Sequence, residues 1–538
     1  MWSCEMQPGK SLKSWAQMHL SFSLLVGALL LLLTYLVFSQ QFAISSPNVV
    51  TTEVELSNKA SGETGRVACS TEGPYGDTCE LDGDVRVNGT ALSVSFVPST
   101  RSRSQRRRRV WRIVSYARRN VTDAKVITVT LQLPDHAAPP PPCTVNHTAR
   151  AVLFALGGYT GNYWHDFTDV LVPLFVASRR YAGDVVLLVA RYNPWWLAKY
   201  ATLLRRLSNH DVVDLDADDA QQVRCFTHLT VGLDMHREFN IVPDLVPGPR
   251  RLTMADFTAF LRDAYALPRA ALPTTRVEVS PPEKEKKKEK PRLLLVHRGR
   301  YRRIVNEEEV LRAAEAAGFD ATVTEPRGDA RVDEQARSVN AFDALVGLHG
   351  AGLTNAVFLP PGAVLLQVVP YGKLEDMARR EFGEPAAAMG LQYLEYSVAA
   401  EESTLLEMLG PDHPVIKDPD SVHRSGWDKV AEFYLGKQDV RINVTRFAPT
   451  LAQAFNHLRQ KKVSHFVYSD TCELEGDVRG NGTSLSRPCS ASEFRKVTVT
   501  KLPNRSAATL CTVTHATPAV VFACVTGSGG LRPRAGDE

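Results

Sequence analysis

Three absences narrow the chemistry open to this 538-residue chain. None of its nine cysteines forms a Cys-x-x-Cys pair, which argues against a zinc site built from thiolates. No Gly-x-Ser-x-Gly sequence occurs, so the chain lacks the nucleophile elbow that esterases require. The formal net charge of +4 is too small to indicate any class of binding partner.

Charged side chains are also missing from Leu20–Phe38, a nearly unbroken apolar run of 19 residues. At a rise of about 1.5 Å per residue, such a helix nearly spans the hydrocarbon core of a bilayer. Lys10 and Lys13 precede the run and the first charge after it is Glu53. The positive-inside rule then predicts a cytosolic tail at 1–19, a signal-anchor at 20–38 and a lumenal remainder. A short span suits the Golgi membrane, so we expect a single-pass type II protein there; a cleaved signal peptide is the alternative.

Features typical of lumenal proteins follow this run. Four cysteines precede the second half of the chain, and oxidation would allow up to two disulfides among them, with three connectivities open. These residues are Cys69, Cys79, Cys143 and Cys225. Sequons predict N-glycosylation at Asn88, Asn120, Asn146 and Asn443, and two further sequons lie at Asn481 and Asn504.

Apolar runs that alternate with helical spacing predict two α/β domains with parallel sheets, at 69–278 and 292–464. Between them, the charged and proline-rich linker 279–291 cannot pack a core. Residues 39–68 are polar and are expected to form a stem. The predicted strands are Ala151–Leu156, Val185–Ala190, Val212–Leu215, Leu293–His297, Ala321–Glu325, Ala344–Leu348 and Ala363–Val369.

A basic block at Arg101–Arg119 holds nine arginines. Clustered arginines bind phosphates, but a lumenal location removes nucleic acid as a partner. We therefore predict a solvated loop inserted in the first domain, and contact with an acidic glycan is the alternative.

The C-terminal segment 465–538 is a partial repeat of 72–155. Repeat architectures need several units to bury a core, and here one incomplete extra copy is present. We predict that it is a disordered or non-functional duplicate, which could be deleted without loss of activity. The matching pairs are Thr471–Thr483 with Thr78–Thr90, Val497–Thr500 with Ile127–Thr130, and Cys511–His515 with Cys143–His147.

The most informative segment is Asp343–Asn355, in which an apolar run ends in His349-Gly350-Ala351-Gly352 and helical character resumes. This pattern predicts a strand, a small-residue turn and a helix N-terminus. Free backbone N–H groups and the positive end of a helix dipole would then face an anion such as a diphosphate. A tight turn without a ligand is the alternative, because glycine fingerprints alone are weak.

Three blocks together resemble plant glycosyltransferase family 61: Gly161–Asp169, Val296–Glu307 and His349–Asn355. The similarity runs in the family's order from about Cys79 to Leu458, and the nearest members are the grass xylan arabinosyltransferases and xylosyltransferases. One departure is His297, where the family would have serine; Arg298 is retained. The resemblance implies a GT-B fold, with two Rossmann-like domains facing a cleft.

The implied activity is metal-independent, inverting transfer of arabinofuranose or xylose from a UDP-sugar to xylan, without a cofactor and in contact with other Golgi transferases. Asp169 would be the base, and helical spacing lets His165 orient or assist it. The donor site would comprise Arg298, Arg302, Asn306, His349, Gly350, Ala351, Gly352, Leu353, Thr354 and Asn355.

Three alternatives stay open. The Asp-x-Asp triplets within Asp214–Asp219 favour a metal-dependent GT-A enzyme. The acceptor could be the N-glycan core or another glycoprotein glycan. The abnormal tail fits an inactive paralogue that serves as a scaffold in a transferase complex.

Overall fold

The computed structural model describes two compact units, which divide between Lys461 and Lys462. The predicted tail, signal-anchor, most of the linker, Asn120 and the sequons at Asn481 and Asn504 lie outside the described residues. Within them, no helix is both long and apolar enough to cross a bilayer. The described residues are 51–57, 64–71, 73, 75–98, 109–119, 121, 125–132, 139–217, 221–272, 290–325, 330–464, 496–501, 508–514 and 520–525, with side chains between 64 and 460.

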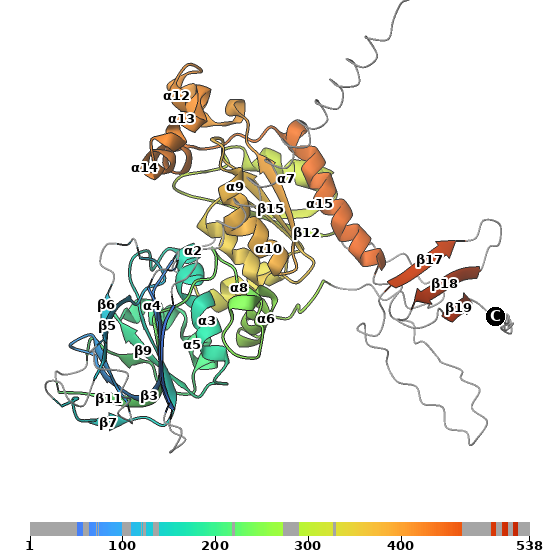
Figure 1. Cartoon of the computed structure of the whole chain (residues 1–538). Helices are drawn as coiled ribbons and strands as arrows, with labels where there is room; N and C mark the ends of the chain where they lie inside the picture. Colours follow the sequence, from blue (N-terminus) through green and yellow to red (C-terminus); the bar gives the residue numbers. More distant parts are fainter. Residues whose placement is uncertain are drawn as a thin grey trace, which may run out of the picture. The chain divides into compact units, whose positions relative to one another are not determined.

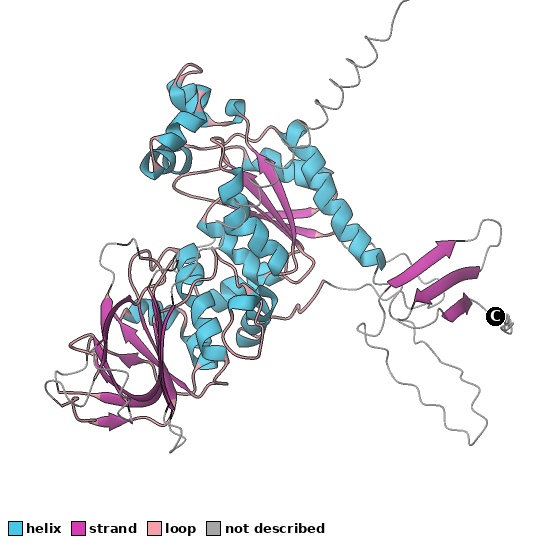
Figure 2. Ribbon diagram, viewed as in Figure 1, coloured by secondary structure: helices cyan, strands magenta, loops and turns pink. Residues whose placement is uncertain are grey.

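The first α/β domain is built on an eleven-stranded mixed sheet (Figures 1 and 2). Its main order is β10-β9-β8-β11-β3-β4-β6-β5, and the first four of these strands are parallel. The strands are β1 (Thr51–Ser57), β2 (Thr64–Ser70), β3 (Thr78–Asn88), β4 (Ser93–Val97), β5 (Arg109–Val114), β6 (Val126–Leu131), β7 (Val145–Asn146), β8 (Arg150–Ala155), β9 (Val185–Ala190), β10 (Val213–Asp214) and β11 (Arg224–Val231).

The parallel strands have apolar sequences because both faces of the sheet are covered. Val152 and Phe154 of β8 pack into one core, whereas Ala151 and Leu153 pack into another. The strand order reverses between β8 and β11, so the loops after these two strands flank a topological switch point. The helical segments are α2 (Tyr163–His165), η1 (Asp166–Leu171), α3 (Val172–Arg179), α4 (Pro194–Lys199), α5 (Ala201–Leu207), η2 (Pro243–Leu245) and α6 (Met254–Ala264).

The predicted stem is wrong at its C-terminal end. β1 pairs with β2 and β2 pairs with β3, both antiparallel, so residues of the stem extend the sheet. The cause is the alternation of apolar and polar side chains in these segments, which suits an antiparallel strand. Val67 and Cys69 are buried on β2 accordingly.

The second α/β domain holds a five-stranded, wholly parallel sheet in the order β13-β12-β14-β15-β16. Its order reverses between β12 and β14. The strands are β12 (Arg292–Val296), β13 (Asp320–Thr324), β14 (Ala344–Leu348), β15 (Val364–Val369) and β16 (Gln392–Ser397). The helical segments are α7 (Glu307–Ala316), α8 (Val332–Asn340), η3 (Ala351–Phe358), α9 (Glu375–Ala378), η4 (Arg379–Gly383), α10 (Glu384–Ala388), η5 (Ala400–Glu402), α11 (Thr404–Leu409), α12 (Pro414–Lys417), α13 (Pro419–Arg424), α14 (Trp427–Val430), η6 (Ala431–Lys437) and α15 (Val444–Ser464).

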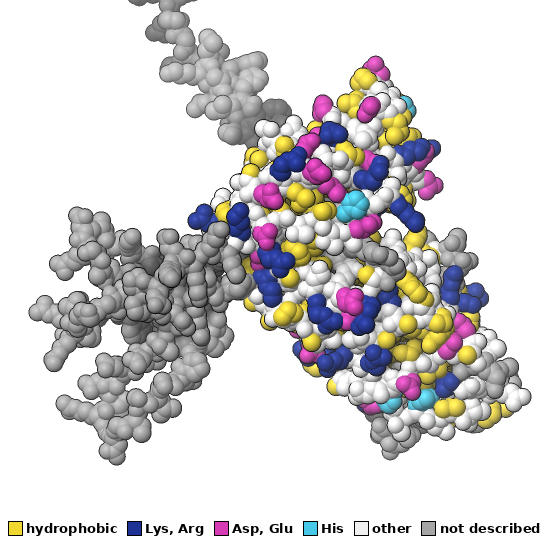
Figure 3. Space-filling model, turned by 180° about the vertical axis from the view of Figure 1, so that it is seen from behind, with side chains coloured by type: hydrophobic (Ala, Val, Ile, Leu, Met, Phe, Trp, Pro, Cys, Tyr) yellow, Lys and Arg dark blue, Asp and Glu magenta, His cyan; other side chains and the backbone are white. Residues whose placement is uncertain are grey.

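The two sheets share one hydrophobic core, and α3, α6 and α10 lie between them in Figure 1. Phe167 of η1 meets Phe358 of η3 edge to face, with ring centroids 6.2 Å apart. A part-buried ion pair joins Arg269 Nη2 to Asp343 Oδ1 at 2.6 Å. The chain therefore has a mixed α/β fold whose two domains are packed together. On the face seen in Figure 3, side chains of both charge signs are interspersed, as the small net charge indicates.

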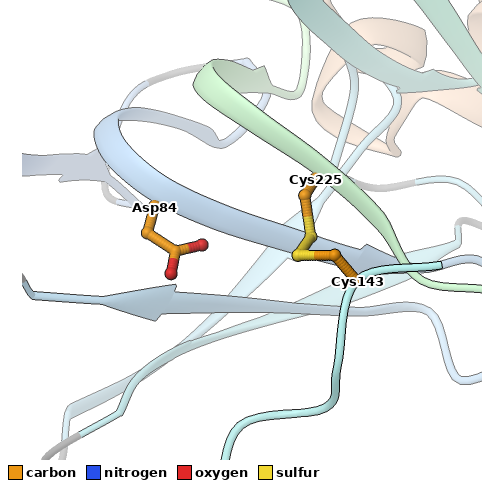
Figure 4. A group of neighbouring side chains, drawn as sticks. All are labelled: Asp84, Cys143 and Cys225. Atoms are coloured by element: carbon orange, nitrogen blue, oxygen red, sulfur yellow. A yellow bond between two sulfur atoms is a disulfide. The ribbon is translucent and has the colours of Figure 1, made fainter. Parts of the chain in front are cut away.

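The four cysteines form the pairs Cys69–Cys79 and Cys143–Cys225, which settles the connectivity left open by the sequence. Asp84 lies beside the second disulfide (Figure 4). Because both sulfurs are bonded to each other, this grouping offers no thiolate to a metal. Asn146 and Asn443 are exposed and Asn88 is part-buried; their glycosylation stays a prediction.

The second unit is an antiparallel sheet of β17 (Lys496–Lys501), β18 (Ala508–Thr514) and β19 (Val520–Val525). These segments are strands, so the disordered form of the prediction does not hold for them; they are rich in β-branched residues, which favour strands. Strands β17 and β18 carry the sequences repeated from β6 and β7, which pair with other strands in the first unit. That the repeat is non-functional stays a prediction.

Candidate active site

Two arginines converge on the turn after β14. Arg298 and Arg302 lie on the loop that leaves the carboxyl end of β12, next to β14 at the switch point. Gly350 has a φ of +138°, and a Cβ built on it would lie 2.7 Å from Arg298 Nη1 and 3.1 Å from Arg302 Nη1. The backbone at Gly350 thus borders both guanidinium groups, which only glycine permits.

Neither of these two cations forms a salt bridge within the described part of the chain. Arg298 Nε donates to Tyr301 O at 3.3 Å, and Arg302 Nη1 donates to His349 O at 3.1 Å. Arg302 Nε is buried without a hydrogen-bond partner, and neither guanidinium pairs with a carboxylate of the described residues. Burial, and then the charge of Arg298, lowers the pKa of Arg302 to about 10. Buried like charges are costly unless a ligand compensates them, so this arrangement suits an anion.

His349 supports the turn as a neutral imidazole. It is buried, Gln367 Nε2 donates to its Nδ1 at 2.7 Å, and Tyr393 OH donates to Gln367 Oε1 at 2.9 Å. Burial first, and then the charges of Arg302 and Arg298, lowers the pKa of His349 to about 3. With Nδ1 accepting, the ring proton is on Nε2, which faces Glu381 Oε2 at 3.5 Å.

The predicted strand, turn and helix are all present, although the helix η3 is of the 3₁₀ type. Gly350, Ala351 and Gly352 lie at the front of the turn. The side chains of Leu353, Thr354 and Asn355 are fully buried, and Asn355 Nδ2 donates to Gly352 O at 2.9 Å. The tight helix turns these side chains into the core, where Thr354 Oγ1 has no hydrogen-bond partner among the described residues; that the three residues bind the donor stays a prediction.

Asn306 was also predicted to bind the donor, but its polar atoms have other partners. Its Nδ2 donates to Ile442 O and its Oδ1 accepts from Ile442 N, both at 2.9 Å, while Nδ2 also donates to Glu309 Oε2. The buried Asn306 amide therefore joins α7 to the segment before α15. These hydrogen bonds occupy its nitrogen and its oxygen, so neither atom is turned toward a nucleotide. His297, the departure from the family pattern, contacts Glu307 at 2.9 Å.

Across from the arginine pair, His165 and Asp169 lie on the helix that follows β8. Asn162 caps α2 by accepting from Trp164 N, and the chain then widens into the π-helix η1. His165 Nδ1 lies 2.9 Å from Asp169 Oδ2, as the spacing predicted. Asp169 is completely buried: Oδ2 also accepts from Tyr116 OH at 2.6 Å, and Oδ1 accepts from Arg118 Nε at 2.9 Å.

The ring of His165 is held between two aromatic side chains. Tyr159 stacks on it with centroids 4.4 Å apart, and Trp164 meets it edge-on at 4.8 Å. Because the acceptor Asp169 fixes the proton on Nδ1, Nε2 carries the lone pair. The His165 side chain is 16% exposed, whereas Asp169 is at 0%, so His165 is the member of the pair that a substrate can reach.

Arg118 joins this pair to a further carboxylate that the sequence did not reveal. Its Nη2 lies 2.6 Å from Glu238 Oε2, and Glu238 follows β11 at the other side of the switch point. Arg119 pairs with Asp77 at 2.6 Å. The prediction of a solvated loop is therefore wrong for these two arginines; residues 101–108 lie outside the described residues. The available signal was their separation from the other arginines by residues 113–117, which hold no charged side chain.

The remaining acidic candidates have structural partners. Asp166 is fully buried and accepts from Gly161 N, Trp196 Nε1 and Tyr200 OH at 2.7–2.8 Å. Asp214 Oδ1 accepts from the backbone of Asp216, and Asp216 Oδ2 accepts from Tyr192 N. Asp218 and Asp219 are outside the described residues, so the Asp-x-Asp alternative stays untested.

Comparison with known proteins agrees with this geometry. The family model for Glycosyltransferase 61 matches residues 163–366, which include His165, Asp169, both arginines and the turn at Gly350. The β-1,2-xylosyltransferase XYXT1 of Oryza sativa subsp. japonica is 41% identical over 399 residues, covering 71% of this chain and 82% of the relative. This chain belongs to glycosyltransferase family 61.

Two other relatives in the family extend the comparison. The α-1,3-arabinosyltransferase XAT3 of the same rice is 40% identical over 384 residues, 71% of this chain and 64% of the relative. The xylan glycosyltransferase MUCI21 of Arabidopsis thaliana is 32% identical over 410 residues, 74% of this chain and 81% of the relative. The family 61 chain is thus a glycosyltransferase, while Arg118 and Glu381 lie outside the residues that the family model matches.

Substituting Gly350→Ala should abolish measurable binding of UDP. A Cβ there would displace Arg298 Nη1, and the positive φ would add about 1–3 kcal/mol of strain. Gly410→Ala is the matched control, because Gly410 has a φ of +80° and its Cβ would meet no atom within 4 Å. Calorimetric titration with UDP and thermal melting check both variants. Equal melting losses with intact UDP binding in both would show that the turn does not hold the anion.

Proposed function

We propose that this chain transfers a pentose, arabinofuranose or xylose, from its UDP-sugar to a xylan-type polysaccharide. The observation that carries the proposal is the uncompensated pair Arg298 and Arg302 at Gly350, together with a reachable histidine on a buried carboxylate in the neighbouring domain. The relatives named for xylan xylosyl and arabinosyl transfer support the donor and acceptor classes.

The parallel part of the first sheet and the wholly parallel second sheet, each with a switch point, support a GT-B arrangement with the substrates between the domains. The N-terminal apolar run and the sequons beyond it support a type II protein of the Golgi membrane. The substrates would therefore be a lumenal UDP-pentose and a growing xylan chain.

His165 and Asp169 exchange the roles that the resemblance implied. Asp169 has no exposed oxygen, and three donors already occupy its carboxylate. His165 Nε2 takes the proton of the acceptor hydroxyl, while Asp169 holds the ring and stabilises the imidazolium that forms. Tyr116 and Arg118 keep Asp169 in place.

The arginine pair stabilises the departing diphosphate. The acceptor oxygen forms a bond to the anomeric carbon as the bond from that carbon to the diphosphate oxygen breaks, on the opposite face of the sugar. The configuration is therefore inverted and no covalent intermediate forms. Arg298, Arg302 and the N–H groups of the turn supply the positive charge that a divalent cation supplies in metal-dependent transferases, so the reaction needs no metal.

We expect the full-length chain in detergent to release UDP from one UDP-pentose when a xylo-oligosaccharide is present, and to continue to do so with a chelator. UDP release and product size are measured with UDP-arabinofuranose and UDP-xylose in parallel. Loss of release on chelation would move the chemistry to the Asp214 segment. If a folded preparation released no UDP with any donor, the result would favour the inactive paralogue.

A further inference from the structure

Glu381 lies on the π-helical turn η4, which interrupts the helix between α9 and α10. A π-helical turn widens a helix by one residue and is common at functional sites. Here the next side chain, Phe382, is buried against Trp164 and His349, whereas Glu381 is 23% exposed. The turn thus places one carboxyl group beside the site while its neighbour anchors the helix.

The charges around Glu381 come from both domains. Burial first, and then the negative charge of Glu238, raises its pKa to about 7, while Arg118 and Arg302 oppose this shift. Arg118 and Glu238 belong to the His165 side of the site, and Arg302 belongs to the proposed diphosphate side. The contacts link Glu381 to both sides: His349, 3.5 Å from its carboxyl group, accepts a hydrogen bond from Arg302 through its backbone oxygen. On the other side, the neighbouring Phe382 packs against Trp164, which contacts His165.

The Glu381 carboxyl is also uncommitted. Among the described residues, its single side-chain partner is the neutral imidazole of His349, whose Nε2 lies 3.5 Å away. The other carboxylates here have short-range partners, since Asp169 and Glu238 both bind Arg118. Gln367, held by Tyr393, donates to His349 Nδ1, so the ring proton of His349 is on Nε2 and faces the Glu381 carboxyl group. At 3.5 Å this contact orients the carboxyl group and leaves its oxygens able to accept other hydrogen bonds.

We propose that Glu381 binds the sugar being transferred, through hydrogen bonds between its carboxyl group and the 2- and 3-hydroxyls of the sugar. The sugar must bridge the leaving diphosphate and the attacking oxygen, and the contacts of Glu381 and Phe382 lead to both sides of the site. A carboxylate has four acceptor sites and can accept from two adjacent hydroxyls at once, which distinguishes pentoses by hydroxyl geometry. The inference rests on the proposed function, since it needs a nucleotide-sugar at the arginine pair.

The test separates binding of the nucleotide from binding of the sugar. Glu381→Gln and Glu381→Asp are compared with Glu384→Gln, a control three residues on whose exposed carboxylate pairs with Arg237. We expect kcat/KM for the UDP-pentose to fall about 10- to 100-fold in Glu381→Gln, the loss typical of a hydrogen bond to a charged group. Affinity for UDP alone should stay within about 3-fold, because uridine and diphosphate contacts are unchanged. Glu381→Asp, which keeps the charge, should lose less than Glu381→Gln.

The pH profile gives an independent readout. As pH rises through the pKa of Glu381, the carboxyl changes from a mixed donor and acceptor to a pure acceptor, so the affinity of the wild type for the UDP-pentose, measured without acceptor so that the base is not used, should rise near pH 7. Glu381→Gln should lack this step and Glu384→Gln should retain it.

Three outcomes would overturn the inference. Equal losses for UDP and UDP-pentose would place Glu381 at the diphosphate, and unchanged kcat/KM would remove it from the substrate altogether. Loss of UDP binding with a lowered melting temperature in both Glu381 variants would make it a structural residue. Failure of the wild type to bind UDP would instead overturn the proposed function, and this inference with it.

Discussion

Replacing His165 by alanine should lower kcat by about 10²- to 10⁴-fold, the usual contribution of a general base, and leave UDP affinity unchanged. Added imidazole should restore part of the rate, because the space left by the ring is next to the acceptor hydroxyl. His210→Ala is the matched control: His210 also contacts a carboxylate, Asp184 at 3.1 Å, on an exposed surface. Single-turnover rates with the UDP-pentose and xylo-oligosaccharide measure the effect.

Asp169→Asn distinguishes the two assignments of the base. If His165 is the base, the His165→Ala, Asp169→Asn double variant should be no slower than the slower single variant, since the two residues act as one unit. If Asp169 were the base, His165→Ala would lose little and imidazole would have no effect.

Replacing Arg298 or Arg302 by glutamine should lower kcat/KM by about 10²- to 10³-fold, as removal of one preorganised donor from a developing negative charge does. UDP affinity should fall as well, because the diphosphate loses charge-assisted hydrogen bonds in both the ground state and the transition state. Affinity for uridine, which has no phosphate, should be unaffected in the same titrations.

Arg300→Gln controls for the general charge of this loop. Arg300 lies between the two residues and is exposed, so removing it tests long-range attraction alone. Equal losses in all three variants would show that the loop acts as a diffuse basic surface and not as a defined diphosphate site.

Much of this fold could be predicted from the sequence, because parallel strands buried on both faces appear as short apolar runs. The runs at Val185–Ala190 and Ala344–Leu348 coincide with β9 and β14. The donor loops followed from the same pattern, since residues directly after parallel strands meet at one edge of a sheet. The short strand β10 lies within the predicted strand Val212–Leu215. The antiparallel strands β1 and β2 were harder to predict, because half-polar strands resemble loops.

The rest of the site depends on contacts between residues far apart in sequence. Arg118 lies 51 residues from Asp169 and 120 from Glu238, and no local pattern encodes those pairs. Conversely, the motif around Gly350 indicated a ligand turn but not which side chains face it. The winding of the 3₁₀ helix η3 determines which side chains face the turn, and it buries those of Thr354 and Asn355.

The core shared by the two domains constrains how substrates enter and leave. Phe358 meets both Phe167 and Tyr265 edge to face, and Arg269 bonds Asp343 beside them. A wide hinge opening would strip this apolar contact at about 25 cal/mol for each Å² exposed to water. For the proposed UDP-sugar donor, exchange by local movement of the Arg298–Arg302 loop therefore costs less than separation of the two domains.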